Sequence, residues 1–331
     1  MPSGEDALIA RLFAPLAGPG GLGLRDDVAL LAPTPGHETV LTVDAVVEGV
    51  HFFDDDPPDG VGAKALGVNL SDLAAKGATP RGFLLALALP SGRAEAWLDS
   101  FAAGLGAAAS AAGCPLLGGD TVSTPGPLMA SITALGEVPA GRMVPRTGAK
   151  PGDLLYVTGT IGDAALGLQV RLTERGGPAP SWLAALPTFE SAFLRERYWR
   201  PRPRLALRDA LALANAAMDV SDGLVGDCAK MLRVSGVSGR LSAARVPCSP
   251  ATAHALEIAP SLREAWLTGG DDYEVLAAVP PGCAAAFETA AAAAGIPVTA
   301  IGEVCAPLGP LRVEGPDGTE WRFARTAYSH V

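Results

Sequence analysis

Acidic residues recur at the points where apolar runs of this sequence end. Asp219 and Asp222 follow the apolar run in AAMDVSDGLVGD (216–227), and Asp227 lies a little further on. Two carboxylates about 4 Å apart repel each other by roughly 4 kcal/mol at an effective dielectric constant near 20. Protonation or a bound cation must offset such repulsion. The pattern therefore raises the question of whether these acids hold metal ions.

The same setting, an acid after an apolar stretch or a glycine pair, occurs in both halves of the chain. The acids that share it are Asp27, Asp44, Asp120, Asp219, Asp222 and Asp271, whereas Asp72 lies inside a predicted helix. Oxygen ligands without Cys or clustered His select hard cations, and Mg²⁺ is the usual one when phosphates complete its shell. If these acids converge, the sequence predicts magnesium-dependent phosphate chemistry.

Each acid also has a purely structural interpretation. Ser71–Asp72 and Ser221–Asp222 could cap helix N-termini, because side-chain oxygens accept the free backbone N–H groups there. Asp72 also precedes Lys76 by four residues, the spacing of an ordinary helical ion pair. Taken singly, each Asp is better explained in this way, and only convergence would decide for metal binding.

Composition limits the classes of protein that remain. The chain has 331 residues, 49% hydrophobic and 18% charged, which favours two folded domains over disorder. The net charge of −10 argues against a partner that is nucleic acid, whose binding depends on Lys and Arg. No long apolar run predicts a membrane span, and no signal peptide is recognised at the amino terminus. Five cysteines, an odd number without zinc-ligand spacing, favour reduced thiols in a cytoplasmic protein.

Alternating helix and strand patterns predict a mixed α/β architecture. We expect helices over 4–17, 62–78, 94–113 and 203–216, and strands over 28–32, 39–52 with an acidic junction, 83–90, 115–120 and 128–138. Gly18, Gly20 and Gly23 fit G-x-G-x-x-G literally, but that motif needs a strand before it and a helix after it. We interpret it as a flexible loop. The domain boundary is expected in 139–153, which is rich in Pro, Gly and basic residues.

A series of segments in this order resembles the thiamine-monophosphate kinase family, within the wider superfamily of aminoimidazole ribonucleotide synthetase. The segments are GEDALIARLF, DDVALL, VDAVVEGVHF, KALGVNLSDLAAKGATP, LLGGDT, GRMVPRTGAKPGD, VTGTIGD, MDVSDGL and TGGDDYEV. The resemblance extends from residue 4 to about residue 276. Each segment alone is weak, and their order makes the match specific.

The resemblance implies an activity and a fold. It implies transfer of the γ-phosphate of ATP to thiamine monophosphate, giving thiamine diphosphate, by direct in-line transfer assisted by several Mg²⁺ ions. It also implies a two-domain α/β fold, with an N-terminal sheet domain (1–145) that binds ATP and Mg²⁺ and dimerises, and a C-terminal α/β domain (150–331). A cytoplasmic homodimer is the expected assembly.

The resemblance also implies site residues by position. The implied metal ligands are Asp27, Thr42, Asp44, Asp72, Asp120, Asp219 and Asp222. The implied ATP contacts are Gly119, Asp120, Arg146 and Ser221, and the implied contacts to thiamine monophosphate are His51 and Asp271. No residue is singled out as a general base. Where the family often has an aromatic residue near the carboxyl end, this chain has Arg325, with Trp321 or Phe323 as stand-ins.

Other hypotheses stay open at this point. A sister ATP-using enzyme of the same superfamily, such as aminoimidazole ribonucleotide synthetase, is the nearest one. Selenophosphate synthetase needs a reactive Cys near its amino terminus, whereas the first Cys here is Cys114. The carbamoyl-dehydrating hydrogenase maturation factor presents a carboxyl-terminal Cys, whereas this sequence ends in YSHV. A metal-loaded binding protein without catalysis would need no nucleotide.

Overall fold

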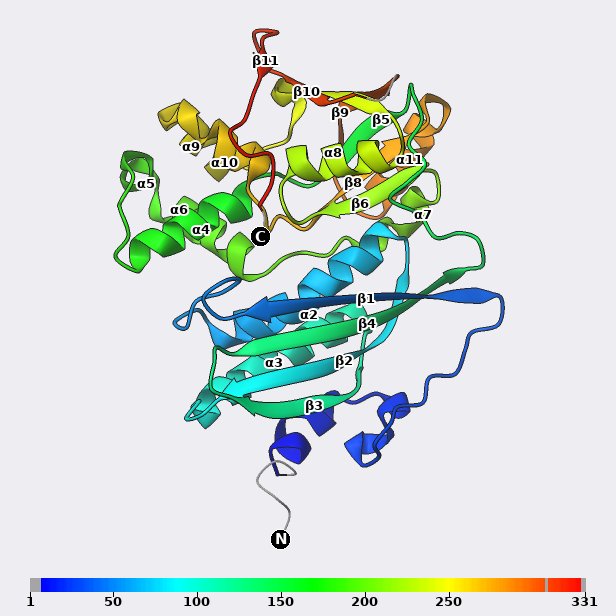
Figure 1. Cartoon of the computed structure of the whole chain (residues 1–331), viewed down its shortest axis with the longest axis vertical. Helices are drawn as coiled ribbons and strands as arrows, with labels where there is room; N and C mark the ends of the chain where they lie inside the picture. Colours follow the sequence, from blue (N-terminus) through cyan, green and yellow to red (C-terminus); the bar gives the residue numbers. More distant parts are fainter. Residues whose placement is uncertain (1–6, 307–308, 329–331) are drawn as a thin grey trace. The chain divides into compact units, whose positions relative to one another are not determined.

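The computed structural model describes residues 7–306 and 309–328, and the chain divides into two compact units. Unit 1 comprises Met1–Leu73 and Ala78–Met143, and unit 2 comprises Ala74–Gly77 and Val144–Val331. Each unit combines helices with one β-sheet (Figure 1), which confirms the predicted mixed α/β class. The separate roles predicted for 1–145 and 150–331 stay a prediction.

Unit 1 is built on a four-stranded sheet with the order β1-β4-β2-β3. Its strands are β1 (His37–Val47), β2 (Thr79–Pro90), β3 (Leu116–Thr124) and β4 (Met129–Pro139). β4 pairs antiparallel with β1 and β2, whereas β3 pairs parallel with β2. Before β1, the chain forms the short helical turns η1 (Ile9–Phe13), η2 (Ala14–Leu16) and η3 (Pro19–Leu24).

Two long helices, α2 (Pro58–Ala75) and α3 (Glu95–Ala112), cover one face of this sheet (Figure 1). They approach each other closely at two glycines. A Cβ on Gly62 would lie 2.2 Å from the Phe101 carbonyl oxygen, and one on Gly104 would lie 1.9 Å from the Asp59 carbonyl oxygen. Glycine is therefore required at this crossing by helix-to-helix contact, not by backbone conformation.

The other face of the unit 1 sheet is apolar and exposed. Strand side chains alternate between the two faces, so paired residues identify which face each one occupies. The helix-covered face carries the buried Ile132 and Leu85, which pair with each other. The opposite face carries exposed large side chains: Leu41, Val43, Leu84, Val122 and Met129. Leu41 and Val43 of the edge strand β1 are 63% and 61% exposed, a feature typical of a surface that binds another protein.

Unit 2 contains a seven-stranded sheet with the order β11-β10-β7-β9-β5-β8-β6. Its strands are β5 (Leu154–Thr158), β6 (Ala216–Val220), β7 (Ser238–Ser242), β8 (Glu274–Val279), β9 (Val298–Cys305), β10 (Leu311–Glu314) and β11 (Glu320–Trp321). Its helices are α4 (Asp163–Glu174), α5 (Ser181–Ala185), α6 (Thr188–Trp199), α7 (Arg208–Leu211), α8 (Leu224–Val234), α9 (Pro250–Ile258), α10 (Arg263–Thr268) and α11 (Ala284–Ala293).

Both faces of the unit 2 sheet are buried. Leu155 and Val157 of β5 belong to the core beneath α8, whereas Tyr156 belongs to the core beneath α7 and α11. This alternation explains why β6 and β8 read as uninterrupted apolar runs apart from Asp219 and Glu274. Helices α4, α5, α6 and α9 surround a third, smaller core.

Some predicted elements are wrong. Residues 28–32 form no strand, and Val28 and Leu30 are exposed instead of paired in a sheet. The helix predicted over 203–216 is reduced to a short 3₁₀ turn (η4, Leu205–Leu207) and α7, because the chain must extend again at Asn215, whose N–H donates to the Ala278 carbonyl (2.8 Å). β1 continues through Asp44 without the expected junction.

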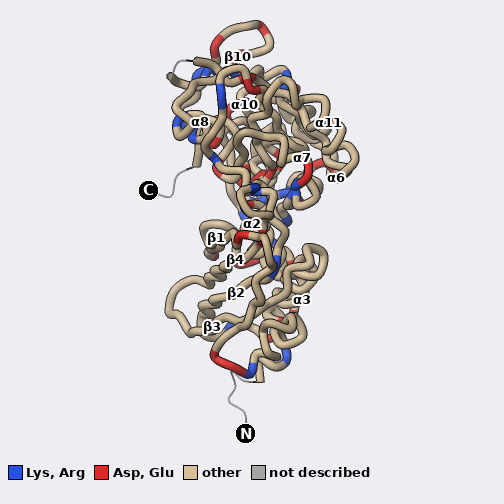
Figure 2. Tube along the Cα trace, turned by 90° about the vertical axis from the view of Figure 1, so that its right-hand side faces the viewer, with Lys and Arg blue, Asp and Glu red and all other residues tan. Residues whose placement is uncertain are grey.

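The helices and charges of the described residues add two further observations. None of the helices in 7–306 and 309–328 combines the length and apolarity that crossing a membrane requires. Figure 2 shows acidic and basic positions interspersed along both units, so neither unit carries charge of one sign alone.

The close crossing of α2 and α3 generates a prediction. Gly104→Ala should lower the free energy of unfolding by about 1–3 kcal/mol, because the new methyl group meets rigid backbone at Asp59. Gly106→Ala on the same helix is the matched control, since its methyl would meet only the flexible end of Leu16. Its cost should be offset by the gain of about 1 kcal/mol in helix propensity. Urea unfolding measures both, and equal effects would contradict the explanation.

Candidate functional site

The first group of predicted site residues lies where β1 meets α2 in unit 1. The Thr42 hydroxyl donates a hydrogen bond to the Asp72 carboxylate. Asp44, two residues further along β1, lies on the same face of the sheet as Thr42. The potential metal ligands of Thr42, Asp44 and Asp72 are all oxygen atoms, which are the ligands that Mg²⁺ prefers. Asp72 lies in the C-terminal half of α2, so the interpretation of Ser71–Asp72 as a cap of a helix N-terminus is wrong.

Asn69 is a residue of this group that the sequence analysis missed. It is fully buried on α2, accepts the Asp44 N–H with its Oδ1 (2.9 Å), and donates from Nδ2 to the Ala65 carbonyl (3.1 Å). It therefore fixes the main chain of β1 at Asp44. The available signal was its spacing, since Asn69 precedes Asp72 by three residues and shares its helix face.

The second group lies at the opposite edge of the same sheet. Asp27, Gly119 and Asp120 line a pocket of about 660 Å³, together with apolar side chains such as Leu117 and Leu135. Asp27 and Asp120 are exposed, so both carboxylates are accessible to a cation. Gly119 also has a structural explanation, because a Cβ there would lie 1.9 Å from the Leu85 carbonyl oxygen of β2.

These two groups cannot share one metal ion within a single copy of unit 1. Asp44 pairs with Ile132, and Leu85 pairs with both Ile132 and Gly119, so Asp44 and Asp120 are three strands apart. Neighbouring strands are about 4.8 Å apart, which separates the two backbones by about 14 Å. The two side chains also point to opposite faces, since Asp120 pairs with the exposed Ala86.

The third group lies at the end of β6 in unit 2. Asp219 is buried, and Ser221 and Asp222 follow it in a loop before α8. Gly223, not a side chain of Ser221 or Asp222, occupies the N-cap position of α8, so the second capping interpretation is also wrong. Asp222 instead forms an ion pair with Lys230.

Asp227 holds this loop from within α8. One oxygen of its buried carboxylate, Oδ2, accepts the N–H groups of Ser221 (3.1 Å), Asp222 (2.9 Å) and Gly223 (3.2 Å). Lys230 donates to its other oxygen (3.1 Å). Burial raises the pKa of the Asp227 carboxyl, although the Lys230 charge and the backbone N–H of Asp222 oppose that rise. Asp227 is thus a structural acid that shapes the loop carrying Asp222.

Asp271 lies on a neighbouring loop of the same unit. Its N–H donates to the Ser221 carbonyl (2.8 Å), and its φ of +73° is unusual for a residue other than glycine. Close packing explains the preceding glycine, since a Cβ on Gly270 would lie 2.5 Å from the Ser221 carbonyl oxygen. The MDVSDG and TGGDDYE segments, about fifty residues apart, therefore form one surface in unit 2.

The remaining predicted residues have varied environments. His51 accepts the Val47 N–H at its Nδ1 (3.1 Å) at the end of β1, so the ring has a structural hydrogen bond there. In the neutral ring this leaves the proton on Nε2. Arg146 is exposed in unit 2. Trp321 and Phe323 are partly buried against the unit 2 core, and their role as aromatic stand-ins stays a prediction.

A metal site is not preassembled in the described part of the chain. Within 7–306 and 309–328, no three Asp, Glu, His or Cys side chains are close enough together to hold a metal ion. The donors nevertheless fit a hard cation, because each of the three groups offers only oxygen ligands. The full set of predicted ligands stays a prediction.

Comparison with known proteins agrees with this architecture. Residues 25–138 match the model of "AIR synthase related protein, N-terminal domain", and residues 150–309 match that of "AIR synthase related protein, C-terminal domain". The fold and its acidic strand ends thus define an AIR synthase related protein.

More specific relatives narrow this class. The chain is 46% identical over 308 residues to a thiamine-monophosphate kinase of Caulobacter vibrioides, covering 91% of this chain and 84% of the relative. The chain belongs to the thiamine-monophosphate kinase family, as its sequence predicted.

Solved structures agree with that assignment. The crystal structure of thiamine-monophosphate kinase from Stenotrophomonas maltophilia K279a has a TM-score of 0.79 and 38% identity, covering 89% of this chain and 90% of its own. A structure described as "AaThiL complexed with AMPPCP and TMP" has a TM-score of 0.76 and 28% identity, covering 99% of this chain and 94% of its own.

The role of Asp227 generates a prediction. Asp227→Ala should lower the free energy of unfolding by about 2–4 kcal/mol, because three backbone N–H groups lose their acceptor. Asp209→Ala removes an exposed carboxylate from the same unit and should change stability by less than about 0.5 kcal/mol. Chemical denaturation at neutral pH measures both. If Asp227→Ala left the free energy of unfolding almost unchanged, the loop would not depend on this carboxylate.

Proposed function

We propose that this protein transfers the γ-phosphate of ATP to thiamine monophosphate and so forms thiamine diphosphate. The observation that carries the proposal is the 46% identity to a thiamine-monophosphate kinase over 91% of the chain. It is supported by a relative, 28% identical over 99% of this chain, whose structure contains both AMPPCP and TMP. AMPPCP is an analogue of ATP, so that relative binds a nucleotide and a thiamine phosphate together.

Transfer would be direct and in line, without a phosphoenzyme. Phosphoryl transfer needs little covalent help from a protein, because positioning and charge neutralisation do most of the work. Several Mg²⁺ ions, when bound, would neutralise the phosphate charge and orient the reacting groups. The residues that would hold them are Asp27, Thr42, Asp44, Asp72, Asp120, Asp219 and Asp222. No general base is assigned.

The residues proposed to bind the substrates are those that the resemblance to the family implies. Gly119, Asp120, Arg146 and Ser221 are the proposed ATP contacts, and His51 and Asp271 are the proposed contacts to thiamine monophosphate. Arg146 is exposed and carries the positive charge that a triphosphate attracts. The main-chain hydrogen bond between Asp271 and Ser221 would fix the proposed thiamine monophosphate contact relative to the proposed ATP contact.

The active form would be a homodimer. The exposed apolar face of the unit 1 sheet supports this, because a row of large aliphatic side chains in water is costly unless a partner covers it. A cytoplasmic location stays a prediction from the sequence.

A direct assay tests the proposed activity. Protein incubated with ATP, Mg²⁺ and thiamine monophosphate should form ADP and thiamine diphosphate in equal amounts. Omission of thiamine monophosphate is the control for ATP hydrolysis, and chelation of Mg²⁺ should stop product formation. If neither product exceeds background, the proposal fails.

Asp120→Asn tests the metal role of an acid that has no structural task. Turnover should fall by about tenfold or more, because one ligand charge is lost. Stability should change little, since Asp120 is exposed and its carboxylate forms no hydrogen bond or ion pair with any other residue of 7–306 and 309–328. Asp209→Asn, equally a loss of one surface charge, should leave turnover unchanged. Thermal unfolding distinguishes a lost ligand from a damaged fold, and unchanged turnover in Asp120→Asn would exclude this role.

A further inference from the structure

The loop between α10 and β8 holds two strained residues. Asp271 has a φ of +73° and Tyr273 a φ of +50°, and the left-handed region disfavours bulky side chains in particular. Such conformations persist only when surrounding contacts enforce them. Two of these contacts come from β6 and its loop, since the Asp271 N–H donates to the Ser221 carbonyl and the Tyr273 N–H to the Val220 carbonyl, both at 2.8 Å.

The residue between them, Asp272, is anchored on a different element. Its carboxylate is almost completely buried and accepts the N–H groups of Gly162 (2.7 Å) and Ala164 (3.3 Å) at the start of α4. Burial raises the pKa of this carboxyl well above its usual range, although the two N–H groups oppose the rise. The side chain of Asp272 therefore points into the protein, which leaves the side chains of Asp271 and Tyr273 beside each other, with the Tyr273 hydroxyl 3.3 Å from Asp271 Oδ1.

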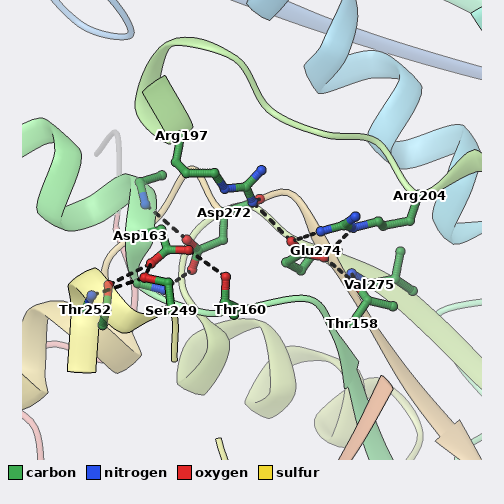
Figure 3. Close-up of polar contacts among 12 residues, drawn as sticks. Thr158, Thr160, Asp163, Arg197, Arg204, Ser249, Thr252, Asp272, Glu274 and Val275 are labelled. Atoms are coloured by element: carbon green, nitrogen blue, oxygen red, sulfur yellow. Dashed lines mark hydrogen bonds and ion pairs between the residues drawn. The ribbon is translucent and has the colours of Figure 1, made fainter. Parts of the chain in front are cut away.

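Arg197 of α6 joins this loop to β8. Its Nη2 donates to the main-chain oxygen of Asp272 (3.3 Å) and to Glu274 Oε1 (3.1 Å), as Figure 3 shows. Arg197 is 3% exposed and Glu274 is fully buried. One guanidinium group thus binds both a carbonyl of the strained loop and the first side chain of the following strand.

Glu274 is held from its other side as well. Arg204 donates from Nε to Glu274 Oε2 (2.6 Å), and the Thr158 hydroxyl donates to the same oxygen (2.6 Å). Burial alone would lower the pKa of Arg204, but the hydrogen bond and charge of Glu274 raise it. A buried carboxylate with so many donors has one orientation, and this suits it for fixing a neighbouring loop.

We infer that Arg197 and Glu274 are positioning residues that hold the 269–273 loop in the strained conformation presenting Asp271 to thiamine monophosphate. The inference rests on the proposed function and deepens it, because it explains how a carboxylate on a loop keeps one orientation. Neither residue touches the substrate in this account. Each acts through the main chain of Asp272 and the start of β8.

The test separates substrate affinity from stability. Arg197→Met keeps much of the side-chain volume but removes both hydrogen bonds, to the Asp272 carbonyl and to Glu274. Its KM for thiamine monophosphate should rise by on the order of tenfold, while its KM for ATP stays within about twofold of the wild-type value. Arg197→Lys keeps the charge but lacks the planar fork, so its KM for thiamine monophosphate should be intermediate.

A matched control shows whether a stability loss alone produces this effect. Val313→Ala removes two methyl groups from the core of the same unit, on β10, which β7, β9 and β5 separate from β8. It should lower the melting temperature without changing either KM. If Arg197→Met does not fold, Glu274→Gln carries the test, because it keeps the shape of the side chain and removes its charge.

A second readout does not depend on activity. Amide hydrogen exchange in 269–273 should be faster by about tenfold in Arg197→Met or Glu274→Gln, while exchange in β10 stays at the wild-type rate. If Arg197→Met, Arg197→Lys and Glu274→Gln all keep the wild-type KM for thiamine monophosphate and the wild-type exchange rate of this loop, the positioning role is excluded. Absence of thiamine diphosphate formation by the wild type would instead overturn the proposed function, and the exchange rates would still decide whether Arg197 holds the loop.

Discussion

The candidate sites of this protein depend on one constraint. The negative charge of each carboxylate must be compensated by hydrogen bonds, by an opposite charge or by solvent. A charged group removed from water is costly unless hydrogen bonds or an opposite charge replace the lost hydration. Asp227 meets this demand with three backbone N–H groups, and Glu274 with two arginines and Thr158. Asp27 and Asp120, in contrast, are exposed in a pocket, where a cation can supply the compensation. The protein therefore contains acids that shape loops and acids that are available for chemistry.

Loop shape in unit 2 follows from this division. The buried acids bind main-chain N–H groups and so fix the backbone beside Asp222 and Asp271, which the proposed chemistry would use. Glycines complete the arrangement, because the two loops approach closely at Gly270. The strain at Asp271 and Tyr273 is consistent with this account, since strained backbone persists only where many contacts enforce it. The buried charges, although costly to remove from water, thus fix the conformation of these loops.

The sheet of unit 1 keeps two of its candidate metal ligands apart. Its sheet places Asp44 with Thr42 and Asp72 on the helix-covered face, and Asp120 on the exposed face three strands away. The strand spacing keeps them apart in one chain. The same exposed face presents the aliphatic side chains that a second copy would cover. The proposed homodimer would therefore cover this apolar surface and remove it from water.

Local sequence determined much of this protein. Apolar patterns predicted α3 closely, α2 with both ends shifted by a few residues, and the strands β2, β3 and β4, because these signals act between neighbours along the chain. The order of the acidic segments identified the family. The sequence also singled out Asp222 and Asp271, but it could not show that their loops touch.

Only the tertiary structure decided which partner each polar group takes. Asn69 accepts the N–H of Asp44, and Asp227 accepts the N–H groups of the loop before α8. Arg197 donates to both Asp272 and Glu274. None of these contacts can be predicted from local spacing. The strand predicted over 28–32 failed for the same reason, since an apolar run becomes a strand only where a neighbouring strand offers hydrogen bonds. Burial and pairing are properties of the assembled chain, and they determine which acids are structural and which are open to a ligand.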